Sequence, residues 1–259
     1  MARPFIIAAA GPARVSRRAT LVFGWTLAIA AIVLFCILGT WQYGRKDQKQ
    51  AMLDQAGEVL ERRDAQPLAA ASSPDAVDGY AWAAGDGAWA TAPAVLLDNQ
   101  QRSGRPGVRV YRLFEPTQGD PLLVELGWLP VPADRTIPAV DGDLPMPPLE
   151  GLLLAPPSAG LAKAAIQPQP DGSLLLMALD LDALAAALGR ERIAPRVLRL
   201  DPAMPGGYVR DLEILPNTLP PEQHLGYAVQ WYGLALAVLV TALILTFRRR
   251  RGARRDPSQ

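Results

Sequence analysis

Two long stretches without a charged residue dominate the pattern of apolar and polar positions along the chain. The first covers residues 19–44 and the second covers residues 225–247. A helix needs about 20 mostly apolar residues to cross the hydrocarbon core of a bilayer, so each stretch is long enough. The sequence therefore predicts two transmembrane helices, at residues 19–43 and 225–247.

The first stretch also invites comparison with a cleaved signal peptide, because basic residues precede it. These are Arg3, Arg14, Arg17 and Arg18. Its apolar core is far longer than the roughly 7 to 15 residues of a signal peptide, and the bulky segment "VLFCILGTW" offers no small-residue cleavage site. We therefore expect an uncleaved membrane anchor.

Basic residues flank the second stretch unevenly. Six arginines follow it within residues 248–255, whereas the fifteen residues before it contain only Arg210. Lys and Arg are enriched in short cytoplasmic loops, so the tail 248–259 is expected in the cytoplasm. Two spans place both termini on one side, which puts residues 1–18 in the cytoplasm and residues 44–224 outside it.

The basic tail has a second interpretation, as a patch that binds nucleic acid or anionic lipid. The formal net charge of the whole chain is only +1, which gives no support to a nucleic-acid partner. A topology signal is the simpler explanation. The first span alone does not indicate an orientation, because Arg45, Lys46 and Lys49 after it nearly balance the arginines before it.

Helical periodicity continues beyond the first span. In "RKDQKQAMLDQAGEVLERR" one face collects the apolar residues Met52, Leu53, Ala56, Val59 and Leu60. This pattern predicts an amphipathic arm that extends the first helix. Residues 66–78 are rich in Ala, Ser, Pro and Asp, which is typical of a loop.

Short apolar runs bounded by turn residues predict strands in the remainder of the exported segment. A hairpin is expected from "PAVLLDNQ" and "VRVYRLFEP". The next two strands are expected at "PLLVELGWLP" and "PLEGLLLAP". The sheet is expected to be closed by "APRVLRLD" and "GGYVRDLEIL". Between them, "ALDLDALAAALGRE" predicts a helix with Asp180 as N-cap and Gly189 as its stop. We expect one α+β domain built on an antiparallel sheet or small barrel.

The exported segment offers few groups for chemistry. The only cysteine of the chain is Cys36, inside the first span, and the only histidine is His224. The segment therefore predicts no disulfide, no Ser–His–Asp triad and no zinc or copper site built from several His or Cys ligands. Asp98, Glu115 and Glu125 have the spacing of ordinary strand and turn residues, with no evident catalytic pair. We expect that the protein is not an enzyme.

His224 stands where the polar segment gives way to the second apolar stretch, at the expected membrane surface. On a helix His224, Tyr227 and Trp231 fall on one side. In one interpretation the aromatic residues form the interfacial belt, small residues let the spans touch, and His224 caps the helix. In the other, the imidazole ligates the metal of a planar cofactor such as haem. Trp41, at the end of the first span, fits both.

Five segments follow one another along the chain as "LGTWQYGRKDQK", "LLDNQQRSGRPGVRVYRLFEP", "LLVELGWLP", "LEGLLLAP" and "HLGYAVQWYGLA". In this order, on either side of a single domain, they resemble the SURF1 family of cytochrome oxidase biogenesis proteins. The strongest pieces are Trp41 and Gln42 with Arg45 after them, and the group His224, Tyr227, Gln230 and Trp231. One segment departs from the pattern: the family strand usually reads Asn-Arg-Gly-Trp, and residues 125–128 read Glu-Leu-Gly-Trp.

The resemblance implies an assembly factor of the bacterial inner membrane that assists delivery of haem a to subunit I of a haem–copper (cytochrome c) oxidase. It maps the family's histidine onto His224, its tryptophan onto Trp41 and its tyrosine onto Tyr227. His224 would ligate the haem iron, with Trp41, Tyr227 and Trp231 packed near the macrocycle. The expected partners are subunit I, haem a synthase and other oxidase assembly factors. The alternative is a cofactor-free scaffold that stabilises subunit I during assembly.

Overall fold

Two apolar helices and a ten-stranded sheet make up the computed structural model, which describes residues 17–157, 165–215 and 218–254. The chain divides into two compact units. One unit is Met1–Lys49 together with Pro220–Gln259, and its described helices form the helical hairpin; the other unit, Gln50–Leu219, is the sheet domain.

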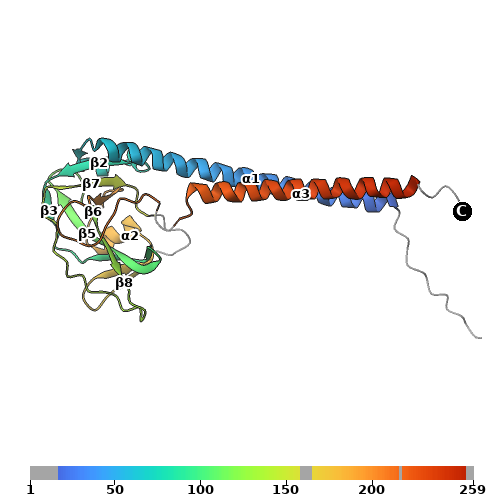
Figure 1. Cartoon of the computed structure of the whole chain (residues 1–259). Helices are drawn as coiled ribbons and strands as arrows, with labels where there is room; N and C mark the ends of the chain where they lie inside the picture. The colour runs from blue at the N-terminus through green and yellow to red at the C-terminus, as the bar shows by residue number, and fades with distance from the viewer. Residues whose placement is uncertain (1–16, 158–164, 216–217, 255–259) are drawn as a thin grey trace, which may run out of the picture. The chain divides into compact units, whose positions relative to one another are not determined.

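The helical hairpin consists of α3 (Pro221–Arg254) and the first part of α1 (Arg17–Arg62), which run antiparallel (Figure 1). Both helices are long and apolar enough to cross a membrane. Both predicted apolar stretches therefore lie in helices. The first helix continues without interruption to Arg62, which confirms the predicted helical arm.

Small residues bring the two helices of the hairpin together. Ala28 on α1 and Ala228 and Ala235 on α3 are buried, and a Cβ atom added to Gly39 would lie 2.9 Å from the ring of Tyr232. Close approach through small residues is the usual basis of helix packing in a bilayer, where apolar burial between helices gives little driving force. Large apolar side chains point outward instead, among them Val22, Phe23, Leu27, Val229, Leu236 and Phe247.

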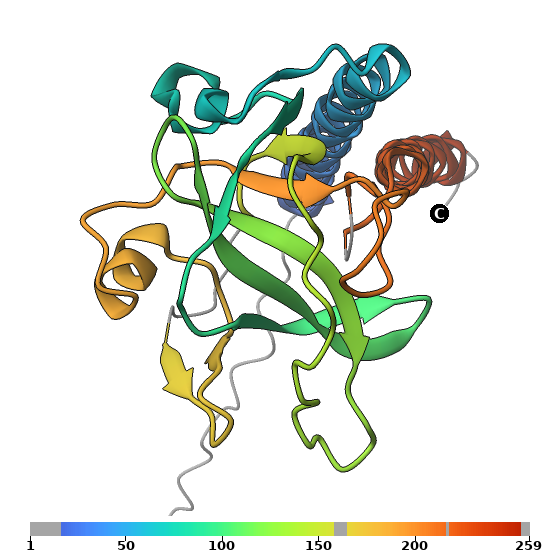
Figure 2. The ribbon, with the colours of Figure 1, turned by 90° about the vertical axis from the view of Figure 1, so that its left-hand side faces the viewer.

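The sheet domain is built on one mixed sheet. Its strands are β1 (Gln66–Pro67), β2 (Ala81–Gly85), β3 (Gly87–Trp89), β4 (Val95–Arg102), β5 (Arg105–Pro116), β6 (Leu122–Pro130), β7 (Leu149–Leu154), β8 (Ile166–Pro168), β9 (Leu174–Leu176) and β10 (Val197–Leu200). They lie in the order β1-β2-β7-β10-β6-β5-β4-β9-β8, and β3 pairs with β5. Figure 2 shows the long strands curving around one another.

The expectation of a purely antiparallel sheet is wrong in part. Among the described residues β1 and β2, β4 and β9, and β6 and β10 pair in parallel, while the other pairings are antiparallel. The parallel pair of β6 and β10 follows from the position of β10, which enters between the consecutive strands β6 and β7. It runs antiparallel to β7 and therefore parallel to β6, and a parallel pair needs the long connection that the intervening segments supply.

Most of the predicted strands and the predicted helix are present. The hairpin forms from β4 and β5 around the turn at Ser103 and Gly104, and β6, β7 and β10 match the other apolar runs. The helix is α2 (Leu181–Ala187), where the carboxylate of Asp180 accepts hydrogen bonds from two backbone N–H groups, as expected of an N-cap. Gly189 follows with φ +65°, as expected of a helix stop.

Two sequence expectations for the domain are wrong. Residues 66–78 are not a plain loop, because they hold β1 and the 3₁₀ helices η1 (Leu68–Ser72) and η2 (Pro74–Ala76). "GGYVRDLEIL" does not close the sheet, since it contributes only an isolated bridge from Val209 to Trp128. The cause is a turn at Gly206 and Gly207, both at positive φ, which leads the chain away from an extended path.

Apolar residues cover both faces of the sheet. On one face the strands pack against η1 and against side chains from the β6–β7 connection, including Ile137, Val140 and Leu144. On the other face they pack against α2 through Leu184 and Ala185. A strand covered on both sides reads as a continuous apolar run, and β6 has this character. Any charged residue in such a strand has to find a partner inside the domain.

Candidate functional site

His224 lies in the first turn of α3 and faces α1 within the helical hairpin. Its side chain is only 7% exposed. The helix begins with Pro221, a residue that suits the first helical position, and the backbone N–H of Gln223 donates to the carbonyl of Pro220 at 3.1 Å. The start of the helix therefore directs the imidazole toward the neighbouring helix.

One hydrogen bond holds the imidazole of His224. Its Nδ1 lies 2.7 Å from Oε1 of Gln42 on α1. An amide oxygen only accepts hydrogen bonds, so this contact is a hydrogen bond when the proton lies on Nδ1, a form of the neutral ring in which Nε2 keeps the lone pair. Nε2 is buried and has no hydrogen-bond partner among the residues that the structure describes.

These features fit a metal-binding histidine in their donor chemistry. A histidine that ligates a metal ordinarily donates its other ring N–H to an oxygen acceptor, which fixes the orientation of the ring. His224 has this arrangement, with Gln42 as acceptor and Nε2 unpartnered. Nε2 is also buried and closed off from solvent. The ring has to rotate, or the helix ends have to move, before Nε2 can meet a ligand.

The aromatic candidates occupy two different surfaces. Trp231 lies on the contact face of α3 and packs against Phe35 of α1, with ring centroids 5.6 Å apart. Tyr227 and Trp41 point outward, with 41% and 56% of their surfaces exposed. The structure thus brings Trp231 to the same helix face as His224 and leaves Tyr227 and Trp41 outside the contact.

Gln42 is the residue whose role the sequence did not reveal. It belongs to the quoted Trp-Gln pair, but only the structure shows its contact with His224. A polar residue near the end of an apolar span is a usable signal, since its amide requires a partner when the helix packs. Nothing in the spacing identifies the partner, because the two residues are 182 positions apart.

An apolar groove of about 600 Å³ lies elsewhere on the helical hairpin, between α1 and α3. Small residues form part of its lining, namely Gly24, Ala28, Ala31, Ala237 and Ala242. The indole Nε1 of Trp25, which also lines the groove, donates to Oγ1 of Thr246 at 3.1 Å.

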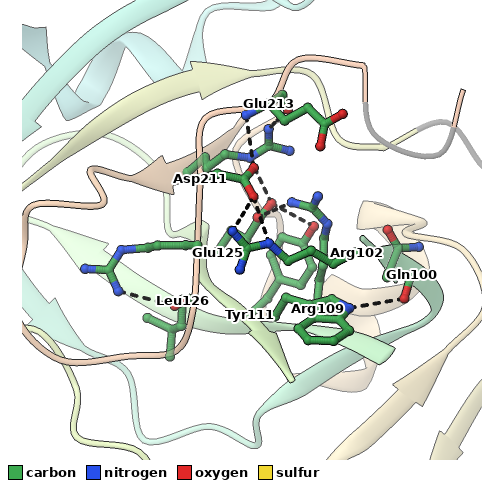
Figure 3. A network of polar contacts seen from close by, with 11 residues as sticks. Gln100, Arg102, Arg109, Tyr111, Glu125, Leu126, Asp211 and Glu213 are labelled. Carbon is green, nitrogen blue, oxygen red and sulfur yellow. Dashed lines mark hydrogen bonds and ion pairs between the residues drawn. The ribbon is translucent and has the colours of Figure 1, made fainter. Parts of the chain in front are cut away.

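A buried polar cluster lies inside the sheet domain and is centred on Glu125 of β6 (Figure 3). The sheet register sets Tyr111 of β5 and Arg199 of β10 opposite Glu125, so that the three side chains form a row across three strands. The carboxylate accepts hydrogen bonds from Nε of Arg199 and from the hydroxyl of Tyr111, both at 3.2 Å. Nη1 of Arg109 donates to the other carboxylate oxygen. All four residues are buried.

Burial and pairing shift the protonation of this cluster. Burial raises the pKa of Tyr111 well above its ordinary value, and the Glu125 carboxylate raises it further. Burial alone lowers the pKa of Arg109, but the attraction of Glu125 outweighs this effect and raises the pKa overall. The cluster therefore holds a neutral phenol and charged guanidinium groups around one carboxylate.

The expectation that Glu125 is an ordinary strand residue is wrong, because its side chain is only 2% exposed. The sequence carried a signal, namely a single acidic residue inside the apolar run "LLVELGWL". The matching cations were also present, as arginines inside the strands "VRVYRLF" and "RVLRL". A buried carboxylate of this kind has to be paired.

The cluster has no room for an organic ligand. The cavity beside it, lined by Arg102, Arg109 and Trp128 among others, measures about 10 Å³, which is barely enough for one water molecule. Throughout residues 17–157, 165–215 and 218–254, no three His, Cys, Asp or Glu side chains gather into a potential metal site. The cluster is therefore a structural element of the sheet, and His224 is the stronger candidate for function.

Comparison with protein-family models gives a match to the SURF1 family over residues 29–236. The match begins inside α1, includes the entire sheet domain and ends inside α3. The chain belongs to the SURF1 family. Comparison with curated proteins gives no match.

SURF1-family proteins act in the assembly of cytochrome oxidase, so the chain belongs to a family of assembly factors. The family match and the two apolar helices together identify a membrane protein. The matched range contains Trp41, Gln42, His224, Tyr227 and Trp231. The predicted resemblance to the SURF1 family is confirmed.

The structure gives Gly127 and Trp128 specific roles within residues 125–128. Gly127 has φ +128°, and a Cβ atom there would lie 2.7 Å from the backbone oxygen of Tyr208. The indole of Trp128 donates to the carbonyl of Gln100 at 3.1 Å. Both residues therefore have backbone roles. The two residues before them are Glu125, the centre of the polar cluster, and Leu126, a buried core residue.

Proposed function

We propose that this SURF1-family protein is an inner-membrane assembly factor that assists delivery of haem a to subunit I of a cytochrome c oxidase. It acts without catalysing a reaction of its own, by holding the cofactor for transfer. The observation that carries the proposal is the state of His224, whose Nδ1 is bound by Gln42 and whose Nε2 lacks a partner among the described residues.

The chemistry of a haem suits this histidine. Haem iron accepts an imidazole nitrogen as an axial ligand, and one protein ligand suits a cofactor that has to be released again. His224 would hold the iron through Nε2, and Trp231 lies on the same face of α3. Tyr227 and Trp41 are exposed, so their aromatic surfaces remain available to a planar ligand or to a partner.

The decisive experiment uses protein purified from cells that make haem a. We expect wild type to carry haem a and His224→Ala to lose most of it, as measured by the optical spectrum and by extraction of the haem. The matched control is Gln223→Ala, which alters the exposed neighbour of His224 on the same helical turn. Equal haem content in wild type and His224→Ala would sink the ligand assignment.

The membrane arrangement is part of the proposal. Both termini lie in the cytoplasm of a bacterial cell, and the sheet domain lies in the periplasm. The six arginines after the second apolar stretch support this orientation. In that position the sheet domain is available to subunit I, to haem a synthase and to other oxidase assembly factors.

A second candidate function is a cofactor-free scaffold that steadies subunit I through the helical hairpin. Two observations favour it, namely the burial of Nε2 and the apolar groove with its small lining residues. Small residues on a helix surface permit close packing of a further transmembrane helix. The scaffold predicts that haem-free protein co-purifies with subunit I, and that His224→Ala does so equally well.

A further inference from the structure

A side-chain hydrogen bond between Gln42 of α1 and His224 of α3 joins the two helices near the start of α3. The distance of 2.7 Å is that of a well-formed bond. Gln42 is partly buried and lies on the side of α1 that contacts α3, as do Phe35 and Gly39. The amide is therefore presented to the imidazole by a packed helix rather than by a loop.

The chemistry of the bond selects one form of the ring. A neutral imidazole exists as two tautomers, with the proton on Nδ1 or on Nε2, and the partner of each nitrogen determines which is present. The contact atom of Gln42 is Oε1, which has no proton to donate. Only the tautomer with a protonated Nδ1 can make this bond.

We infer that Gln42 is a positioning residue that fixes His224 in the Nδ1–H tautomer and so keeps the lone pair on Nε2 for an electron-pair acceptor such as a metal centre. Burial strengthens this selection, because the opposite tautomer would place an N–H at Nε2, which is buried and has no partner among the described residues. The link to a metal rests on the proposed function, whereas the tautomer itself does not depend on it.

The single histidine of the chain makes the tautomer directly measurable. Full-length protein is produced with ¹⁵N-labelled histidine and a histidine-free affinity tag, placed in lipid nanodiscs without haem, and observed by NMR at alkaline pH. Only the two ring nitrogens of His224 contribute imidazole signals. We expect the wild type to show a protonated Nδ1 and an unprotonated Nε2.

Three variants separate positioning from general packing. Gln42→Met keeps the length of the side chain but removes the acceptor, so we expect the proton to move to Nε2 in a large share of molecules. Gln42→Glu supplies a carboxylate that also accepts from Nδ1, so it should restore the wild-type signals. Gln230→Met makes the same substitution at an exposed position of α3 and should leave them unchanged.

The outcomes are distinct. A wild type with its proton on Nε2 overturns the inference, and so does a Gln42→Met spectrum identical to that of wild type. If Gln42→Met does not assemble, the wild-type and Gln42→Glu spectra still decide the tautomer. If His224→Ala carries as much haem as wild type, the haem proposal fails, but the NMR result for the tautomer is unaffected. The failure of one hypothesis can therefore be distinguished from the failure of the other.

Discussion

Arg199 and Glu125 lie opposite each other on the parallel strands β10 and β6, with Nε of Arg199 3.2 Å from Oε2 of Glu125 and both side chains at most 2% exposed. Glu125 is also the partner of Arg109 on the other neighbouring strand. One carboxylate therefore joins the three central strands of the sheet. Two guanidinium groups depend on it for charge compensation.

The first prediction concerns the removal of this charge. Glu125→Gln keeps the shape of the side chain but removes the carboxylate that forms ion pairs with two buried guanidinium groups. Breaking a buried ion pair by removing one partner costs about 3–5 kcal/mol. We expect the free energy of unfolding of the sheet domain to fall by this order, as measured by denaturant unfolding of the full chain in detergent. Glu150→Gln, an exposed change on β7, should stay within about 0.5 kcal/mol of wild type.

The second prediction concerns alkaline pH. The folded pKa of Tyr111 lies above the unfolded value of about 10, because of burial first and of the Glu125 carboxylate second. Its contribution to stability is therefore complete below about pH 10 and is lost as the pH rises toward the folded pKa. We expect the thermal midpoint to fall above about pH 10, and to fall less steeply in Tyr111→Phe.

Tyr80 provides the comparison for this experiment. Burial also raises its pKa, although less strongly than that of Tyr111. Tyr80→Phe should reduce the fall of the thermal midpoint at alkaline pH by a smaller amount than Tyr111→Phe. If the midpoint of Tyr111→Phe falls with pH as steeply as that of wild type, Tyr111 is not the source of the alkaline destabilisation.

The third prediction concerns Gly127. Its φ of +128° and the 2.7 Å approach of a Cβ atom to the backbone oxygen of Tyr208 together exclude a side chain without movement of the backbone. Gly172 has a positive φ as well, at +86°, but nothing lies within 4 Å of its Cβ position. Gly172→Ala should cost about 1–3 kcal/mol from backbone strain alone, and Gly127→Ala should cost clearly more. Equal unfolding midpoints for the two variants would show that the close approach has no effect.

The fourth prediction concerns topology. In a background of Cys36→Ser, a single cysteine is placed at Met146, which is 80% exposed in the sheet domain, or at Ser258 in the tail. A membrane-impermeant thiol reagent applied to spheroplasts should label Met146→Cys at once and Ser258→Cys only after lysis. The reverse labelling pattern would invert the proposed orientation.

Local patterns predicted the elements that local chemistry determines. The charge-free stretches gave the two apolar helices, the apolar face from Met52 to Leu60 gave the arm of α1, and Asp180 gave the start of α2. Each of these depends on residues within a few positions of one another. Capping, periodicity and span length are properties of this kind.

Contacts between distant positions were not predictable in the same way. The placement of β10 between β6 and β7 depends on which strand edges remain open after the rest of the sheet has paired. The polar cluster depends on that placement, because Arg199 meets Glu125 only in this register. The bond between Gln42 and His224 likewise depends on how two apolar helices align, and an apolar surface specifies its alignment only through packing.

The insertion of β10 also determines the order in which the strands can pair during synthesis of the protein. The strand that fills the middle of the sheet is the last to be synthesised, and α3 follows it closely in the chain. Until Leu200 has emerged, β6 and β7 each present an open edge toward the other, and such edges are prone to pair with foreign strands. Completion of the sheet therefore nearly coincides with entry of the second apolar helix into the membrane.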